Sequence, residues 1–255
     1  MPKISVSSWS LHRHIGKDIN LLDFPGIARK KFGLDAIELV DFQFPSTEKD
    51  YLNKLKQNVQ QNGLKVVHIA AGRGNISQRD EKQRLEDVKA LYAVLDIAVF
   101  FGTPAIRIDT GKQEGEIDLS ITIDSYKRLA ERARKLGLTI TLENHGGLSG
   151  DADNLVKIIE SVGKDVMGTC PDFGNFPAET RYESLTKIAP YAVILHAKTH
   201  EFGPDGEEKH TDFARCAQIF KSFTGYWSVE FEGPGDQYDG TIKTIALIKK
   251  HVRTR

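Results

Sequence analysis

Little cysteine, no excess charge of either sign and no long apolar run characterise this sequence of 255 residues. Its two cysteines, Cys170 and Cys216, are too few for a disulfide framework. One bridge between them is conceivable, but free thiols in a reducing, cytoplasmic setting are the simpler expectation. Basic and acidic residues number 35 each, so no global field favours nucleic acid or an anionic membrane as a partner. The longest apolar runs are too short to span a bilayer, and no signal-peptide pattern opens the chain.

Short apolar runs rich in strand-forming residues alternate with longer amphipathic stretches from one end of the chain to the other. The expected strands are Ile4–Ser8, Ala36–Val40, Lys65–Ile69, Ala105–Ile108, Thr139–Leu142, Val166–Cys170, Ala192–Leu195 and Trp227–Glu230. The helix-like stretches include Tyr51–Asn62, Glu81–Phe101, Ser120–Leu136, Ala152–Val162 and Thr241–Val252. Strands buried on both faces and separated by helices indicate a parallel sheet, and eight such units indicate closure into a barrel.

Glycines support the same division, because Gly33, Gly63, Gly102, Gly137 and Gly163 each follow a helix pattern shortly before a strand. No linker rich in proline, glycine or serine and no charge block divides the chain. The length is typical of one barrel of eight strand–helix units. The sequence therefore predicts an α/β protein, a single (β/α)8 TIM barrel covering residues 1–255.

Four expected strands in the second half each end close to a side chain that can hold a metal ion. These side chains are Glu143, Asp172, His196 and Glu230. Taken one at a time they have ordinary explanations, such as a helix-capping carboxylate, a turn aspartate or a core histidine. At the ends of neighbouring barrel strands, however, they would converge, and three converging carboxylates repel one another unless a cation neutralises them. Three carboxylates and one imidazole favour one divalent ion, Mn²⁺, Mg²⁺ or Co²⁺, with Zn²⁺ as the alternative.

Further polar or aromatic side chains are expected at the same mouth. Trp9 follows the first strand, Glu38 and His68 lie in the second and third, Arg107 in the fourth, and Lys198 two residues beyond His196. We predict that all five contact the substrate. The alternatives are an ion pair inside the barrel for Glu38 and simple packing for Trp9.

The longest stretch without a structural pattern is Thr199–His210, which contains Gly203-Pro204-Asp205-Gly206. Long loops after barrel strands usually serve the site, so this one is a candidate lid or substrate loop. The alternative is a surface excursion without a role.

The order and spacing of these motifs resemble the sugar-phosphate isomerase/epimerase family of xylose isomerase-like barrels. The motifs are Thr141-Leu142-Glu143-Asn144-His145, Pro171-Asp172-Phe173-Gly174-Asn175, His196-Ala197-Lys198 and Val229-Glu230-Phe231-Glu232-Gly233, together with the strands that carry Glu38 and His68. The resemblance implies one metal ion bound by Glu143, Asp172, His196 and Glu230. It also implies acid and base roles for Glu143 and Glu230 on opposite faces of an enediolate.

The resemblance implies a metal-dependent sugar isomerase or epimerase acting on a small ketose, aldose or related polyol. One alternative is a lyase of the inosose or dehydroshikimate dehydratase type, in which the same enediolate expels a hydroxyl group. A non-catalytic sugar-binding barrel and an abasic-site endonuclease are others. Members that cut DNA at abasic sites use about three zinc ions and extra histidines, and here Arg107 and Asn175 stand where histidines would be needed. Barrels of this kind are often dimers, so a homo-oligomer is conceivable, although the sequence carries no interface signal.

Overall fold

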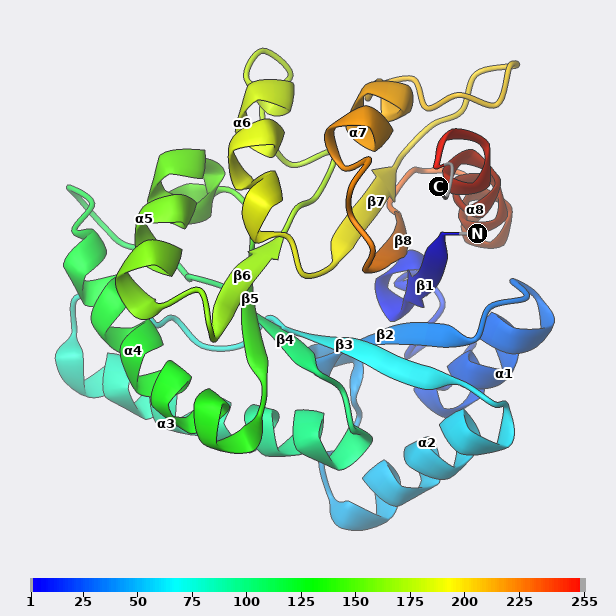
Figure 1. Cartoon of the computed structure of the whole chain (residues 1–255). Helices are drawn as coiled ribbons and strands as arrows, with labels where there is room; N and C mark the ends of the chain where they lie inside the picture. The colour runs from blue at the N-terminus through cyan, green and yellow to red at the C-terminus, as the bar shows by residue number, and fades with distance from the viewer. Residues whose placement is uncertain (1, 253–255) are drawn as a thin grey trace.

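The alternation of strands and helices folds as a parallel barrel in the computed structural model, which describes residues 2–252 (Figure 1). The fold class is therefore confirmed. The strands are β1 Lys3–Ser7, β2 Ala36–Val40, β3 Lys65–Ala71, β4 Ala105–Ile108, β5 Thr139–Glu143, β6 Met167–Cys170, β7 Leu195–Thr199 and β8 Tyr226–Phe231. The helices are α1 Phe24–Lys30, α2 Lys49–Gln61, α3 Glu81–Phe101, α4 Leu119–Leu136, α5 Ala152–Val162, α6 Arg181–Ile188, α7 Phe213–Ile219 and α8 Gln237–His251.

The strands follow one another around the barrel in chain order, and every pairing is parallel. The continuous ladder runs β6-β5-β4-β3-β2-β1-β8-β7, so β1 lies beside β8. Two isolated bridges, Thr169 with Ala192 and Asp172 with His196, join β6 to the chain around β7 and close the ring. Parallel strands place all their carboxyl ends at one mouth, which is where the site residues gather.

The seventh strand begins later than the sequence suggested. Ala192–Leu195 was expected, but β7 starts at Leu195, where pairing with Trp227 of β8 begins. The preceding residues close the seam with β6 instead, because the N–H of Val193 donates to the carbonyl oxygen of Thr169. As a result His196 and Lys198 lie within β7 rather than beyond a strand.

The closing seam depends on a glycine. A Cβ atom at Gly168 in β6 would lie 2.4 Å from Val193 Cγ2 and 2.6 Å from the carbonyl oxygen of Tyr191. Both distances are too short for any side chain, so the segment before β7 can approach β6 only where no side chain intervenes.

Inside the barrel, the alternation of side chains along each strand produces layers. Ala36, Val67, Cys170 and Ile194 form a small apolar cluster, separate from the main core, with Tyr226 packed against it. Side chains two residues apart point to the same face of a strand. The next layer toward the mouth therefore contains Glu38, His196 and Ser228, two residues after Ala36, Ile194 and Tyr226. The layer above it contains Lys198 and Glu230, again two residues further along. The interior thus passes from apolar to charged toward the mouth.

The main core lies outside this ring, between the strands and the helices. It includes strand residues such as Ile37, Leu39, Ile106 and Val229, and helix residues such as Leu129 of α4. Both cysteines are buried free thiols. Within residues 2–252 the longest helices are too polar to cross a bilayer.

Candidate metal centre

The structure brings the four predicted metal ligands together at the mouth. Glu143 is the last residue of β5, Asp172 follows β6, and His196 and Glu230 lie in β7 and β8. All are buried, and each offers one oxygen or nitrogen atom such that these four atoms lie within 4.8 Å of one another. Ligand atoms on opposite sides of one hard cation are about 4.2–4.6 Å apart, since each bond is about 2.1–2.3 Å. The four residues therefore fit one divalent ion with little adjustment; their role as ligands stays a prediction.

One oxygen of Asp172 is held in place by the protein and the other is left for a ligand. Oδ1 accepts the backbone N–H groups of Gly174, at 2.7 Å, and Asn175, at 3.0 Å. Oδ2 is buried and accepts no well-directed hydrogen bond, although Lys198 Nζ lies 3.1 Å away. A buried carboxylate oxygen without a hydrogen-bond donor is a place where a cation would be stabilised.

Asn144 holds the backbone beside this aspartate. Its Oδ1 accepts the N–H of Asp172 at 2.7 Å, and its Nδ2 donates to the carbonyl oxygen of Asp172 at 3.0 Å. These two bonds tie the end of β5 to the end of β6 and fix the separation of Glu143 from Asp172. No role was predicted for Asn144; the available signal was an amide side chain directly after a predicted ligand.

The acids of the site have pKa values displaced in opposite directions. Burial raises the pKa of Asp172 to about 7, and Glu143 and Glu230 reinforce this effect while Lys198 opposes it. Burial alone would also raise the pKa of Glu143, but Arg107, His196 and Lys198 hold it well below its ordinary value. The site therefore contains one carboxylate that is firmly ionised and another that binds a proton near neutrality.

The two basic side chains expected at the mouth, Arg107 and Lys198, both form ion pairs. Arg107 Nη1 lies 2.6 Å from Glu143 Oε2, and Arg107 Nε lies 3.1 Å from Asp109 Oδ1. Lys198 is almost fully buried, and its Nζ lies 3.1 Å from Asp172 and from Glu230 and 3.2 Å from Glu232. Arg107 and Lys198 thus offset much of the negative charge, and their role as substrate contacts stays a prediction.

Trp9 lies at the mouth as predicted. It follows β1, and its Nε1 donates to Glu232 Oε1 at 2.5 Å. Its ring stacks on His12, with ring centroids 4.5 Å apart, and meets Phe42 edge-on at 5.5 Å. Phe42 is 47% exposed, so an aromatic surface lies beside the acidic centre. Contact of Trp9 with a substrate stays a prediction.

Glu38 and His68 do not reach the surface of the mouth. Both side chains are fully buried, and His68 Nδ1 lies 2.9 Å from Glu38 Oε2. The structure therefore shows the buried pair considered as the alternative for Glu38, and it adds His196, whose Nε2 lies 3.0 Å from the same oxygen. Direct substrate contact by either residue stays a prediction, but the surroundings favour a supporting role.

Two further titratable groups beside the site were missed from the sequence. Asp109 and His145 form, with Glu143, a second acidic cluster whose ligand atoms also lie within 4.8 Å of one another. His145 Nδ1 is 3.7 Å from Asp109 Oδ2 and 4.0 Å from Glu143 Oε2, and the His145 side chain is 55% exposed. For His145 the available signal in the sequence was its position two residues after Glu143.

The long loop after β7 is folded around a buried glutamate. Glu208 accepts the N–H groups of His200 and Glu201 through Oε1 and those of His210 and Thr211 through Oε2. The loop places His200 Nε2 3.8 Å from Glu232 Oε2, at the edge of the site. A lid or substrate role for it stays a prediction.

Fold and sequence together assign the chain to a family. The model of the xylose isomerase-like TIM barrel family matches residues 28–251, and the chain belongs to this family. A curated relative, the 3'-dehydrocarminate deglycosidase alpha subunit of Microbacterium sp, is 24% identical over 206 residues, which are 77% of this chain and 54% of the relative. The chain thus spans about half the length of that protein.

Solved structures share the fold at low sequence identity. An L-ribulose 3-epimerase has a TM-score of 0.82 at 17% identity, with 99% of this chain and 95% of that chain covered. A xylose isomerase-like TIM barrel protein from Mycobacterium smegmatis in complex with magnesium has a TM-score of 0.73 at 17% identity, with 98% and 96% covered. A probable 3-DHS dehydratase from Bacillus anthracis has a TM-score of 0.72 at 16% identity, with 99% and 100% covered.

Proposed function

We propose that this protein is a metal-dependent isomerase or epimerase that moves a proton through an enediolate on a small ketose, aldose or related polyol. The observation that carries the proposal is the convergence of Glu143, Asp172, His196 and Glu230 on one point at the barrel mouth. When bound there, a divalent cation such as Mn²⁺, Mg²⁺ or Co²⁺ would polarise a carbonyl and hydroxyl pair and so acidify the neighbouring C–H bond. The similarity to a sugar epimerase and to a magnesium-containing barrel supports this choice.

The two glutamates are suited to exchange a proton with such a substrate. Glu143 and Glu230 come from strands three positions apart around the barrel, so their carboxylates approach a bound sugar from different sides. Arg107 keeps Glu143 ionised and therefore able to accept a proton. Lys198 lies 3.1 Å from Glu230 Oε2, where its ammonium would hold a substrate oxygen beside that glutamate.

The charges at the mouth favour an uncharged sugar over a phosphorylated one. Arg107 and Lys198 already contact Glu143, Asp109, Asp172, Glu230 and Glu232, so their charges are offset and neither supplies an unbalanced positive charge for a phosphate group. These five carboxylates outnumber the two cations, and with His196 bound to the metal ion as a neutral ligand the two charges of one dication would not fully offset the excess. An anionic substrate would be repelled, whereas hydroxyl groups suit acceptors and donors of this kind.

A direct test is exchange of solvent deuterium into neutral ketoses and aldoses in the presence of Mn²⁺. We expect exchange at a carbon next to the carbonyl, and we expect Glu230→Gln to abolish it. Glu183→Gln, on the exposed side of α6, is the matched control and should exchange normally. Absence of exchange over a broad panel of sugars by metal-loaded wild-type protein would overturn the proposal.

A lyase is the second candidate, and the pair of His145 and Asp109 favours it. Expulsion of a hydroxyl group requires a proton donor in addition to the base, and His145 lies beside Glu143 with an exposed ring. The similarity to a probable dehydratase supports the same choice. Loss of water in the product mass, sensitive to His145→Ala, would identify this reaction; deuterium incorporation without loss of water would identify the isomerase.

A further inference from the structure

A line of four fully buried side chains starts beneath the proposed metal ligands and ends at one of them, His196. Thr141 Oγ1 lies 2.9 Å from His68 Nε2, and His68 Nδ1 lies 2.9 Å from Glu38 Oε2. The same oxygen of Glu38 lies 3.0 Å from His196 Nε2. The other nitrogen of His196, Nδ1, faces Glu143 at 2.5 Å and Glu230 at 3.7 Å. The line therefore begins deep in the barrel and ends at the metal centre.

The chemistry of these groups fixes where the protons sit. A carboxylate oxygen between two imidazoles can only accept, so each imidazole must present an N–H to Glu38. This places the proton of His68 on Nδ1 and that of His196 on Nε2. The hydroxyl of Thr141 then donates to the free Nε2 of His68. By the same rule, His196 Nδ1 presents an N–H to Glu143 Oε1, 2.5 Å away, as long as no metal ion is bound, and a metal ion held by His196, Glu143 and Glu230 would take the place of that proton.

From this geometry we infer that Glu38 is a positioning residue that sets the tautomer and the orientation of His196 for metal binding. The inference rests on the proposed metal centre, because it concerns how Glu38 orients one of the ligands of that centre. A carboxylate that accepts the second N–H of a ligating histidine fixes the ring and makes the ligating nitrogen more basic. His68 and Thr141 keep Glu38 in place in turn, and all three side chains are fully buried.

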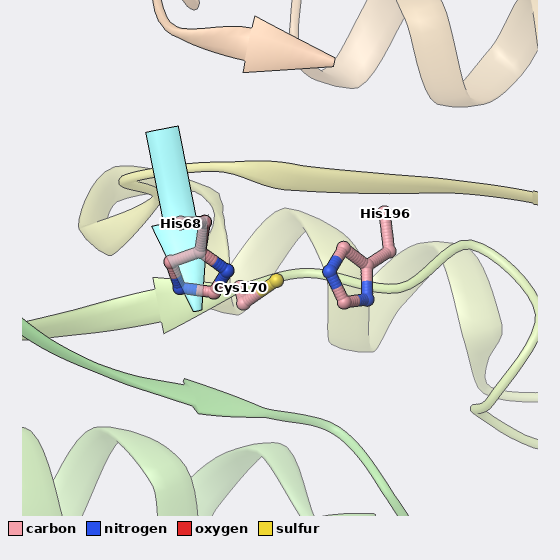
Figure 2. Close-up of side chains that lie close together, drawn as sticks. All are labelled: His68, Cys170 and His196. Carbon is pink, nitrogen blue, oxygen red and sulfur yellow. The ribbon is translucent and has the colours of Figure 1, made fainter. Parts of the chain in front are cut away.

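The same region offers an alternative, a second and softer metal site. His68, Cys170 and His196 lie close together, with the thiol between the two rings (Figure 2). Each imidazole nitrogen of the pair already has a partner, namely Glu38, Thr141 or Glu143. A metal ion would have to break these buried bonds, and burial also raises the pKa of the Cys170 thiol to about 12. The geometry therefore favours a hydrogen-bonded support.

The tautomers can be read in the wild-type protein without any substitution. Long-range proton–nitrogen NMR of the Mg²⁺-loaded protein should show His68 protonated on Nδ1 and not on Nε2, which is the less common form. His196 should be protonated on Nε2, and its Nδ1 signal should shift when Mg²⁺ is added. Protonation of His68 on Nε2, or coordination of the metal through His196 Nε2, would overturn the inference.

Metal affinity gives the second readout, measured by calorimetry with Mn²⁺ and no substrate. Glu38→Gln should weaken binding about 10–100-fold, because a neutral amide is the poorer acceptor for the N–H of His196. Ser5→Ala is the matched control, since Ser5 is equally buried and its hydroxyl has no hydrogen-bond partner among the described residues. It should bind Mn²⁺ like the wild type.

The outcomes separate this inference from the proposed function. If wild type and Glu38→Gln bind Mn²⁺ equally, the positioning role is wrong and the metal centre stands. If wild type binds no metal ion, both fail. Should Glu38→Gln not fold, Thr141→Val serves instead: it removes only the last bond of the line, and it should move the nitrogen signals of His68 and weaken Mn²⁺ binding by a smaller factor. Unchanged signals and affinity in that variant would also overturn the inference.

Discussion

Metal binding should stabilise the folded protein by an amount that depends on pH, because Asp172 must lose a proton to serve as a ligand. At a free Mn²⁺ concentration about 100 times Kd, an ion that binds only the folded state adds about 2.7 kcal/mol to the free energy of unfolding. For a chain of this size that corresponds to a rise in Tm of about 5–10 °C. Thermal unfolding with and without Mn²⁺ measures this shift.

The sign of the pH dependence follows from the raised pKa of Asp172, about 7 against an ordinary value of 3.8. Without metal, the contribution of this group to stability is present below its ordinary pKa and is lost as pH rises through about 7. The metal ion binds the ionised form of Asp172, so the stabilisation that the metal ion adds grows as pH rises through about 7. At pH 6 the apparent affinity should be about tenfold lower than at a pH well above 7, and the stabilisation at the same Mn²⁺ concentration should fall from about 2.7 to about 1.4 kcal/mol.

Two variants locate the ion. Asp172→Asn removes a ligand of the proposed centre and should abolish the Tm shift, whereas His145→Ala belongs to the neighbouring cluster with Asp109 and should retain it. If the Tm shift were lost in His145→Ala but kept in Asp172→Asn, the ion would be bound by the cluster of Asp109, Glu143 and His145, and the proposed centre would be wrong. A shift of equal size at pH 6 and pH 8 would refute the assigned role of Asp172.

Three further outcomes follow from the structure. If the assigned proton transfers are right, Glu143→Gln and Glu230→Gln should each lower kcat by about 10²–10⁴-fold in steady-state assays with saturating metal. Gly168→Ala should lower the free energy of unfolding by about 1–3 kcal/mol in urea titrations, because its Cβ would collide with Tyr191 and Val193; a neutral effect would contradict the packing of the seam. For any sugar that is turned over, its phosphate ester should show a higher KM, with the difference shrinking as salt is added.

Much of the architecture could be predicted because local patterns carry it. The strand Ala36–Val40 and the helix Glu81–Phe101 were predicted with the bounds that the structure shows, since buried strands are short apolar runs and Gly102 ends the helix in the left-handed conformation. Helices α1, α6 and α7, of seven or eight residues, were not picked out individually, because so few turns give little periodicity. The later start of β7 was missed because contacts with β6, far away in the sequence, decide it.

The sequence by itself determined the kind of site: oxygen and imidazole ligands near the ends of four successive strands, at a mouth that parallel strands must share. Only the tertiary structure decided how deep in the barrel each side chain lies and which charged side chains contact one another. It placed Glu38 and His68 beneath the mouth rather than in it, joined them to His196, and engaged Arg107 and Lys198 with the acids they accompany. The physical reason is that the stagger between neighbouring strands sets the height of each side chain in a barrel. That stagger arises only when the ring closes.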